Sequence, residues 1–124
     1  MIHHLALGCL NLKRMLAFYE SFTDFSLLEK HRFSDGSLRS IWLQSDGVIL
    51  MLELIEQKQL LEASNDQGLF LMAVPLRDEP QLRRQLSQAE IPIESESDYS
   101  LYIRDPEGNR LAFSSYPVPR AESE

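Results

Sequence analysis

One order of strand-like and helical segments occurs twice along the chain, and this repeat limits the possible folds more than any other feature. The first half predicts a strand, a helix and three further strands, over 3–9, 12–25, 27–33, 38–44 and 48–55. The second half predicts the same order, over 68–76, 78–90, 91–95, 99–104 and 110–116. A unit of about 55 to 60 residues is too small to bury its own sheet face, so we expect two such units to pack into one structure.

The repeat therefore predicts an α+β fold of two βαβββ modules within a single domain, 1–124. Module 1 is expected over about 1–57 and module 2 over about 68–116, with a polar linker at 58–67 and a mobile tail at 117–124. Asn11 suits a helix cap, and Pro80 suits the first turn of a helix. Asp-Gly pairs at 35–36 and 46–47 supply the positive φ that tight hairpin turns require.

Composition excludes several classes of function. The net charge is -7, with 19 acidic and 12 basic residues, so the chain repels phosphate backbones and nucleic acid is not an expected partner. No apolar run approaches the roughly 20 residues that span a bilayer, and MIHHLALG lacks the features of a secretory signal. The single cysteine, Cys9, is expected to be a buried, inert thiol. We expect a cytoplasmic protein with no membrane partner.

Two separated motifs resemble those of one superfamily. The segment HHLALGCLNLKRMLAFYES at 3–21 resembles the opening strand and helix of the vicinal oxygen chelate superfamily, which includes glyoxalase I, the extradiol dioxygenases, and the fosfomycin and bleomycin resistance proteins. The segment DPEGNRLAF at 105–113 resembles the family's turn into its last strand. The resemblance covers 2–116 and implies curled mixed sheets around a cleft, with the helices outside. It also implies a homodimer, with each cleft formed within one chain or across two.

The resemblance implies four positions for metal ligands, on the first and last strand of each module. Two of these positions carry competent ligands for Zn, Ni, Fe or Mn, namely His4 and Glu53. The other two carry Leu71 and Ala112, which have no lone pair to offer. A catalytic metal usually has three protein ligands. We therefore expect no metal and no other cofactor, although a residual divalent site at His4 and Glu53 stays open.

Other side chains on the same strands are candidate ligand contacts: Trp42, Tyr102, Arg110, Ser114 and Tyr116. For the aromatic residues among them, core packing is the alternative. Glu53 lies in an apolar run, so it is expected either to face a wet cleft or to pair with Arg110. If His4 and Glu53 are neighbours, the carboxylate favours the protonated imidazole, and the pair is a candidate acid and base for catalysis without metal.

Three functions are consistent with these residues. The first is a metal-independent small-molecule binder of the bleomycin-resistance type, for a cationic or neutral ligand. The alternative is a glyoxalase-like lyase or isomerase, or a dioxygenase, with an atypical metal site or with His4 and Glu53 as acid and base. The third is a subunit whose cleft is structural and whose surface binds a partner protein.

Overall fold

The computed structural model describes residues 2–56 and 71–117. The chain divides into two compact units, one of Met1–Leu69 with Asp105–Gly108 and the other of Phe70–Arg104 with Asn109–Glu124. No helix among the described residues is long and apolar enough to span a membrane. The predicted linker at 58–67 and residues 118–124 of the predicted tail lie outside the described residues.

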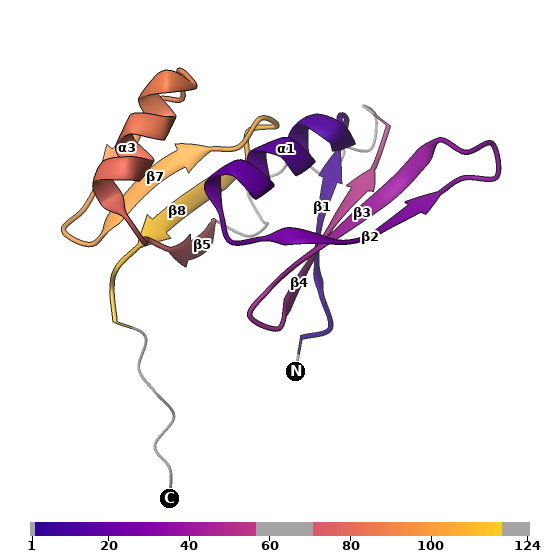
Figure 1. The fold of residues 1–124 in the computed structure, drawn as a ribbon, viewed down its shortest axis with the longest axis horizontal. Helices are drawn as coiled ribbons and strands as arrows, with labels where there is room; N and C mark the ends of the chain where they lie inside the picture. Colours follow the sequence, from indigo (N-terminus) through magenta and orange to yellow (C-terminus); the bar gives the residue numbers. More distant parts are fainter. Residues whose placement is uncertain (1, 57–70, 118–124) are drawn as a thin grey trace, which may run out of the picture. The chain divides into compact units, whose positions relative to one another are not determined.

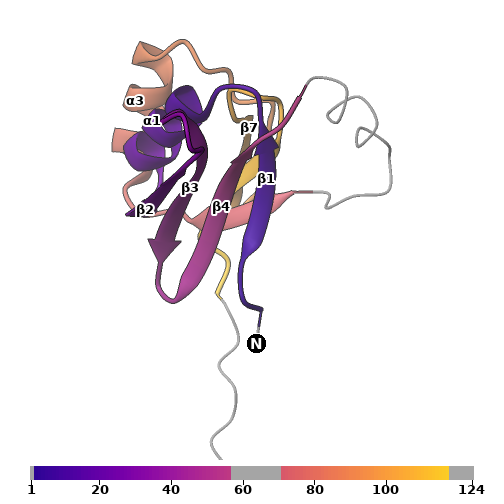
Figure 2. The ribbon, with the colours of Figure 1, turned by 90° about the vertical axis from the view of Figure 1, so that its right-hand side faces the viewer.

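The first unit contains one helix and a four-stranded mixed sheet (Figure 1). Its elements are β1 (Leu5–Cys9), α1 (Leu12–Phe22), β2 (Ser26–Arg32), β3 (Leu38–Ser45) and β4 (Val48–Leu54). The strand order is β1-β4-β3-β2, and Figure 2 shows these strands side by side. The β1–β4 pair is parallel and the other two pairs are antiparallel, so β1 and β2 are the edges of the sheet.

The core of this unit lies between α1 and one face of the sheet. The helix buries a stripe at helical spacing, made of Leu12, Met15, Phe18 and Tyr19. It lies against β2, β3 and β4. The strands contribute fully buried Ile41, Leu43, Leu50 and Leu52. The remaining residues of β3 and β4 point to the opposite face, because strand side chains alternate.

The turn Asp105–Gly108 belongs to the first unit through contacts around α1. The Glu107 carboxylate accepts hydrogen bonds from the backbone N–H of Leu10, at 2.7 and 2.8 Å, and of Asn11, at 2.9 Å. A negative charge just before a helix N-terminus is favourable to the helix dipole. The Tyr19 hydroxyl donates to Asp105 Oδ2 at 2.8 Å, and both residues are buried. Burial, and then the Asp105 charge, raise the pKa of Tyr19.

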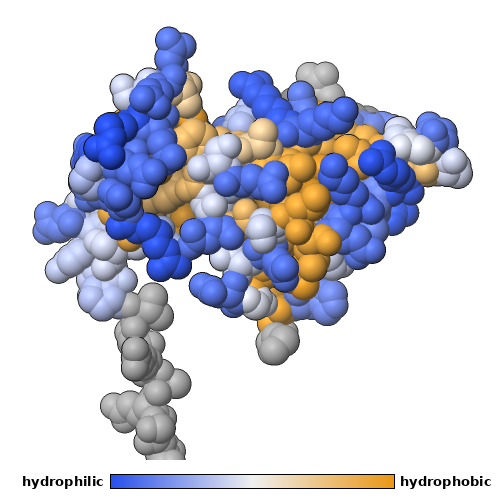
Figure 3. All heavy atoms as spheres, viewed as in Figure 1, coloured by the Kyte–Doolittle hydropathy of each residue, from blue (hydrophilic) through white to orange (hydrophobic). Residues whose placement is uncertain are grey.

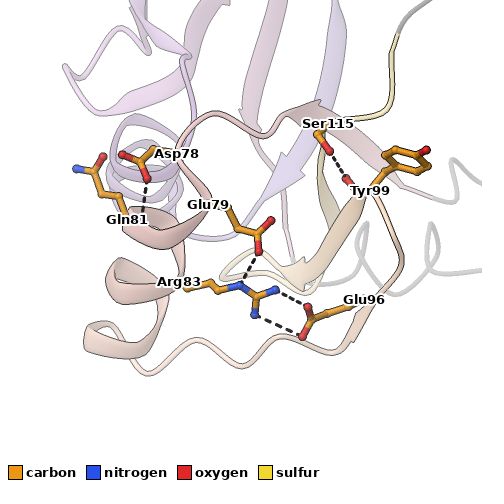
Figure 4. Close-up of polar contacts among 7 residues, drawn as sticks. All are labelled: Asp78, Glu79, Gln81, Arg83, Glu96, Tyr99 and Ser115. Carbon is orange, nitrogen blue, oxygen red and sulfur yellow. Dashed lines mark hydrogen bonds and ion pairs between the residues drawn. The ribbon is translucent and has the colours of Figure 1, made fainter.

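The second unit repeats the first on a smaller scale, with β5 (Met72–Pro75), α3 (Glu79–Gln88), β6 (Ser95–Glu96), β7 (Ser100–Arg104) and β8 (Arg110–Ser114). Its strand order, β5-β8-β7-β6, corresponds to that of the first sheet, with a parallel β5–β8 pair. Apart from Ala112, its buried apolar residues come from α3 and from alternate positions of β7 and β8: Leu82, Leu86, Leu101, Ile103, Leu111 and Phe113. On the surface, Arg83 of α3 pairs with Glu79 at 3.0 Å and also with Glu96 of β6 (Figure 4).

The predicted fold of two βαβββ modules is confirmed, although several elements are shorter than predicted. The first helix ends at Phe22 rather than near Phe25, because Thr23 takes an extended backbone and its hydroxyl accepts a hydrogen bond from the Phe25 N–H. The strand predicted at 91–95 is only Ser95–Glu96. Pro92 has no backbone N–H to donate to a neighbouring strand, and Glu90, two residues earlier, has a positive φ of 58°.

Part of the apolar surface lies outside the core. Leu27 and Leu28 on the edge strand β2 are 41% and 44% exposed. Figure 3 shows apolar surface running below α1 and along the strands of the first unit.

Candidate functional site

The first candidate surface is the face of the first sheet that points away from α1, which we call the distal face. Trp42 on β3 pairs with Met51 on β4, and both lie at positions between fully buried residues. On β1, Ala6 pairs with Met51 and Gly8 with Glu53. Strand alternation continues this face to His4.

Trp42 is surrounded by imidazole rings from both edges of the sheet. The His4 ring, just before β1, lies 5.3 Å from the indole between ring centroids, with an interplanar angle of 35°. The His31 ring, on β2, lies at 5.4 Å and 63°. His3 lies at 6.5 Å, nearly perpendicular to the indole. These distances lie in the range of stacked and edge-to-face aromatic pairs, so the rings form one continuous aromatic surface.

Hydrogen bonds fix the orientation of the imidazoles. His31 Nδ1 lies 3.3 Å from the Ser40 hydroxyl, and its Nε2 lies 3.3 Å from Glu29 Oε2. With the proton on Nε2, His31 donates to Glu29 and accepts from Ser40. The Nδ1 atoms of His3 and His4 lie 2.9 Å apart, so one ring donates and the other accepts. If His4 is the donor, its Nε2 keeps a lone pair for a ligand.

One polar atom within this surface is unsatisfied. Trp42 Nε1 is shielded from solvent and has no hydrogen-bond partner among the described residues. A buried N–H donor without an acceptor costs about 1–3 kcal/mol. Within the described part of the first unit, the Trp42 N–H therefore lacks an acceptor, and an added acceptor would stabilise the folded state.

Glu53 is placed differently from the histidines. It is exposed on the distal face, so solvent removes the burial penalty that its apolar neighbours suggested. Its Cα partners are Gly8 and Ser40, whereas His4 lies four residues before Gly8. Four residues of strand span roughly 13 Å. Among the described residues His4 hydrogen-bonds His3 rather than Glu53, so the first unit by itself does not assemble the acid–base pair.

In the second unit, the two other positions that the resemblance implies for metal ligands lie on one face of the sheet. Ala112 pairs with Ala73 and Tyr102, and Leu71 precedes β5 in the same alternation as Ala73. Ala112 is 2% exposed, Leu71 is half-buried, and neither side chain carries a donor atom.

The other predicted ligand contacts of this unit lie near the same face. Tyr102 is half-buried, and Arg110 is exposed at the start of β8. The Ser114 hydroxyl already accepts from Ser100 Oγ at 3.0 Å and from the Tyr116 N–H at 3.2 Å.

Tyr116 extends beyond β8 and is 62% exposed. Its ring packs edge-to-face on Tyr99 at 4.9 Å, and the backbone carbonyl of Tyr99 accepts from the Ser115 hydroxyl (Figure 4). These contacts order the end of the sheet, whether or not the tyrosines also contact a ligand.

The donor set does not fit a metal ion held by three or more protein side chains. The four positions present one imidazole, one carboxylate, one leucine and one alanine. Within residues 2–56 and 71–117, no three His, Cys, Asp or Glu side chains are grouped so as to hold a metal ion. Two donors from one unit are fewer than structural or catalytic zinc sites use.

Cys9 is unsuited to nucleophilic chemistry. It is fully buried on the α1 side of β1, and its thiol donates to the Leu7 carbonyl at 3.3 Å. Burial, followed by the nearby charges of Glu107 and Asp105, raises the pKa of the Cys9 thiol to about 12. The thiol therefore stays protonated at neutral pH.

Sequence reasoning missed His3, His31 and Ser40 as members of the site. The side chain of His31, in the strand predicted at 27–33, is 30% exposed and contacts Trp42. The signal was present in the turn at Asp35-Gly36, because a hairpin centred there brings His31 opposite Ser40, two residues before Trp42.

Comparisons with known proteins agree with the predicted superfamily and fold. The family model described as Glyoxalase/Bleomycin resistance protein/Dioxygenase superfamily matches residues 1–113. No curated protein sequence matches the chain.

Three solved structures illustrate the similarity of the fold. A glyoxalase family protein from Enterococcus faecalis has a TM-score of 0.68 at 18% identity, over 93% of this chain and 97% of its own. TioX from Micromonospora sp. ML1 has a TM-score of 0.64 at 17% identity, over 95% and 98%. The fosfomycin resistance protein FosX from Listeria monocytogenes, an E126Q mutant in complex with Mn(II) and 1S,2S-dihydroxypropylphosphonic acid, has a TM-score of 0.75 at 11% identity, over 95% and 94%.

Proposed function

We propose, from the premise that the chain belongs to the Glyoxalase/Bleomycin resistance protein/Dioxygenase superfamily, that it binds a small molecule without using a metal ion. The observation that carries this proposal is the loss of donor atoms at Leu71 and Ala112. An ion held only by His4 and Glu53 is expected to bind weakly, because these side chains lie at different levels of the first sheet.

The remaining surface favours binding over metal chemistry. The distal face presents Trp42 and three imidazoles where an exposed sheet face is usually polar and solvated. Ligand sites are mostly apolar or aromatic surfaces with a few polar groups that fix orientation. The FosX structure, which holds a small phosphonic acid, supports the idea that this fold accommodates small ligands.

Metal content and ligand binding test the proposal together. Untagged protein, purified without chelator and then incubated with Zn, Ni, Fe(II) or Mn, is analysed by elemental mass spectrometry. We expect far less than one ion per chain. A chemically diverse ligand panel is then screened for a rise in Tm, which we expect to be the same with and without added metal.

The matched variants are His4→Ala and His3→Ala. Each removes one of two neighbouring imidazoles, but only His4 lies at a family ligand position. Near-stoichiometric metal that is lost in His4→Ala and kept in His3→Ala would contradict the proposal and favour the enzyme alternative. Turnover of a ligand that disappears in both His4→Ala and Glu53→Gln would do the same.

Homodimer formation and a cytoplasmic location stay predictions. Leu27 and Leu28 are exposed on β2, an edge of the first sheet among the described residues, and they support self-association, because the unpaired N–H and C=O groups of a sheet edge can pair with another chain. Sedimentation velocity over a range of concentrations measures the oligomeric state directly.

A further inference from the structure

The sequence contains two Asp-Gly pairs, each preceded by serine, at 34–36 and 45–47. A glycine after aspartate has no side chain to shield its backbone nitrogen from the aspartyl carboxyl group, so such pairs rearrange to isoaspartate more readily than other dipeptides. We infer that the pair at 46–47, in the turn between β3 and β4, is a site of spontaneous isoaspartate formation, and that the fold protects the pair at 35–36. The inference goes beyond the proposed function and does not depend on a ligand.

The reaction needs neither an oxidant nor an enzyme. The backbone nitrogen of Gly47 forms a bond to Cγ of Asp46 and loses its proton, while a carboxyl oxygen leaves as water, which closes a succinimide ring. Water from the solvent then adds to one ring carbonyl and breaks the bond from that carbon to the nitrogen. If this carbon is the main-chain carbonyl carbon of Asp46, the chain afterwards continues through Cγ, and the mass is unchanged.

The first argument is that the attacking nitrogen is hydrogen-bonded in one turn and not in the other. In the first turn, Gly36 N–H donates to the Phe33 carbonyl at 3.0 Å. Gly47 N–H has no hydrogen bond within residues 2–56 and 71–117. Attack by the Gly36 nitrogen therefore requires a hydrogen bond to break first, whereas attack by the Gly47 nitrogen does not.

The second argument is the state of the two carboxyl groups. Asp35 Oδ1 accepts from the Ser37 hydroxyl at 2.6 Å and from the Ser37 N–H at 2.9 Å, and these bonds lower the pKa of Asp35. An ionised carboxylate lacks the proton with which its oxygen leaves as water, so these contacts oppose ring closure. Asp46 is exposed, and its carboxyl group has no hydrogen bond or ion pair among the described residues.

The third argument is the backbone of the two turns. Asp46 has a φ of 47°, in the left-handed region that residues other than glycine rarely adopt, so it loses little when it leaves this conformation. In the first turn, Arg32 Nη1 donates to the Gly36 carbonyl at 2.9 Å, and the Phe33 N–H donates to the Ser37 carbonyl at 2.8 Å. Ring closure requires local opening of a turn, which these additional bonds oppose at Asp35.

The product changes the hairpin of β3 and β4 (Figure 1). Ser45 pairs with Val48, so the loop between the two strands consists of Asp46 and Gly47. Isoaspartate adds one methylene group to the main chain of this loop. The modification therefore lies in the connection that sets the register of the two strands.

The unfolded chain is a matched control, because both aspartates follow serine and precede glycine. Folded protein and protein in urea are incubated for equal times in the same mildly acidic buffer and are then digested with trypsin. Cleavage after Arg32 and Arg39 places the two aspartates on different peptides. Electron-transfer fragmentation distinguishes isoaspartate from aspartate in each peptide, and methylation by a protein isoaspartyl methyltransferase measures the total.

In the folded protein, we expect isoaspartate to form about tenfold faster at Asp46 than at Asp35, because the hydrogen bonds that must break raise the barrier at Asp35. In urea, we expect the two rates to agree within about twofold, because the unfolded chain keeps only fluctuating local structure. Equal rates in the folded protein would overturn the inference. So would a difference that persists in urea, or a folded Asp46 that stays unmodified while the unfolded chain is converted.

Variants test the two turns separately. Ser37→Ala removes the hydroxyl that binds Asp35 and is expected to raise the rate at Asp35 in the folded protein without changing the rate at Asp46. The matched control is Ser34→Ala, which removes a neighbouring hydroxyl that makes no hydrogen bond within the described residues and is expected to change neither rate. An unchanged rate at Asp35 in Ser37→Ala would overturn the inferred protection. Asp46→Glu, whose longer side chain disfavours ring closure, is expected to abolish the modification of its peptide, and a modification that persists there would overturn the assignment to Asp46.

Discussion

Removal of the Tyr19 hydroxyl tests whether the Asp105–Gly108 turn stabilises the first unit. In Tyr19→Phe the ring still packs against α1 neighbours such as Phe18, but the 2.8 Å hydrogen bond to Asp105 is lost. Tyr19 is 0% and Asp105 4% exposed, so water does not readily replace the donor. A hydrogen bond to a charged group contributes about 1.5–3 kcal/mol. Because Asp105 Oδ1 keeps the Glu107 N–H at 2.9 Å, we expect a loss of about 2 kcal/mol.

Urea unfolding followed by Trp42 fluorescence measures this loss, because Trp42, Tyr19 and Asp105 belong to the same unit. With a slope of about 2 kcal/mol/M, the midpoint is expected to fall by roughly 1 M. The control is Tyr116→Phe, which removes the hydroxyl of a 62% exposed tyrosine and is expected to change stability by less than about 0.5 kcal/mol. If the two variants have the same midpoint, the turn does not stabilise the first unit through Tyr19.

Three further predictions concern other parts of the chain. A Cβ at Gly8 would lie 2.6 Å from Ile55 Cδ1, so we expect Gly8→Ala to destabilise by about 1 kcal/mol in the wild type and by less in an Ile55→Val background, measured as a double-mutant cycle. Arg83 lowers the pKa of Glu96 from its ordinary value of 4.5, so their pairing stabilises the fold above that pH and is lost as the pH falls through the lower folded value. Arg83→Gln is therefore expected to lower Tm at neutral pH and to lower it progressively less as the pH falls below 4.5, and a difference that persists unchanged in acid would contradict this assignment. Cys9 is expected to react with iodoacetamide only after unfolding, and rapid labelling of native protein would show that its thiol is accessible.

The elements of the fold are largely determined by local sequence. Asn11 caps α1 by accepting from the Arg14 N–H at 3.0 Å, and the Asp-Gly pairs turn the hairpins with positive φ at Gly36 and Gly47. These signals act over a few residues, so they can be read without tertiary information. The element ends were predicted less well, because the end of α1 depends on the hydroxyl of Thr23, which hydrogen-bonds within its own turn.

The sequence also determined the chemistry that is missing. The side chains of Leu71 and Ala112 carry no donor atom in any conformation, so two of the four ligand positions that the resemblance implies cannot supply a side-chain ligand. Alternation along 3–9 was likewise sufficient to place His4 and Cys9 on opposite faces.

Tertiary structure alone decided which of the remaining residues meet. The register of β2 on β3 brings His31 to Ser40 and Trp42, and the register of β1 on β4 separates His4 from the level of Glu53. The turn at Asp105–Gly108 contacts Leu10 and Tyr19, which lie more than eighty residues earlier in the chain. Strand pairing and such distant contacts depend on the packing of whole elements, because a shift of one residue in register reverses the face on which every side chain lies.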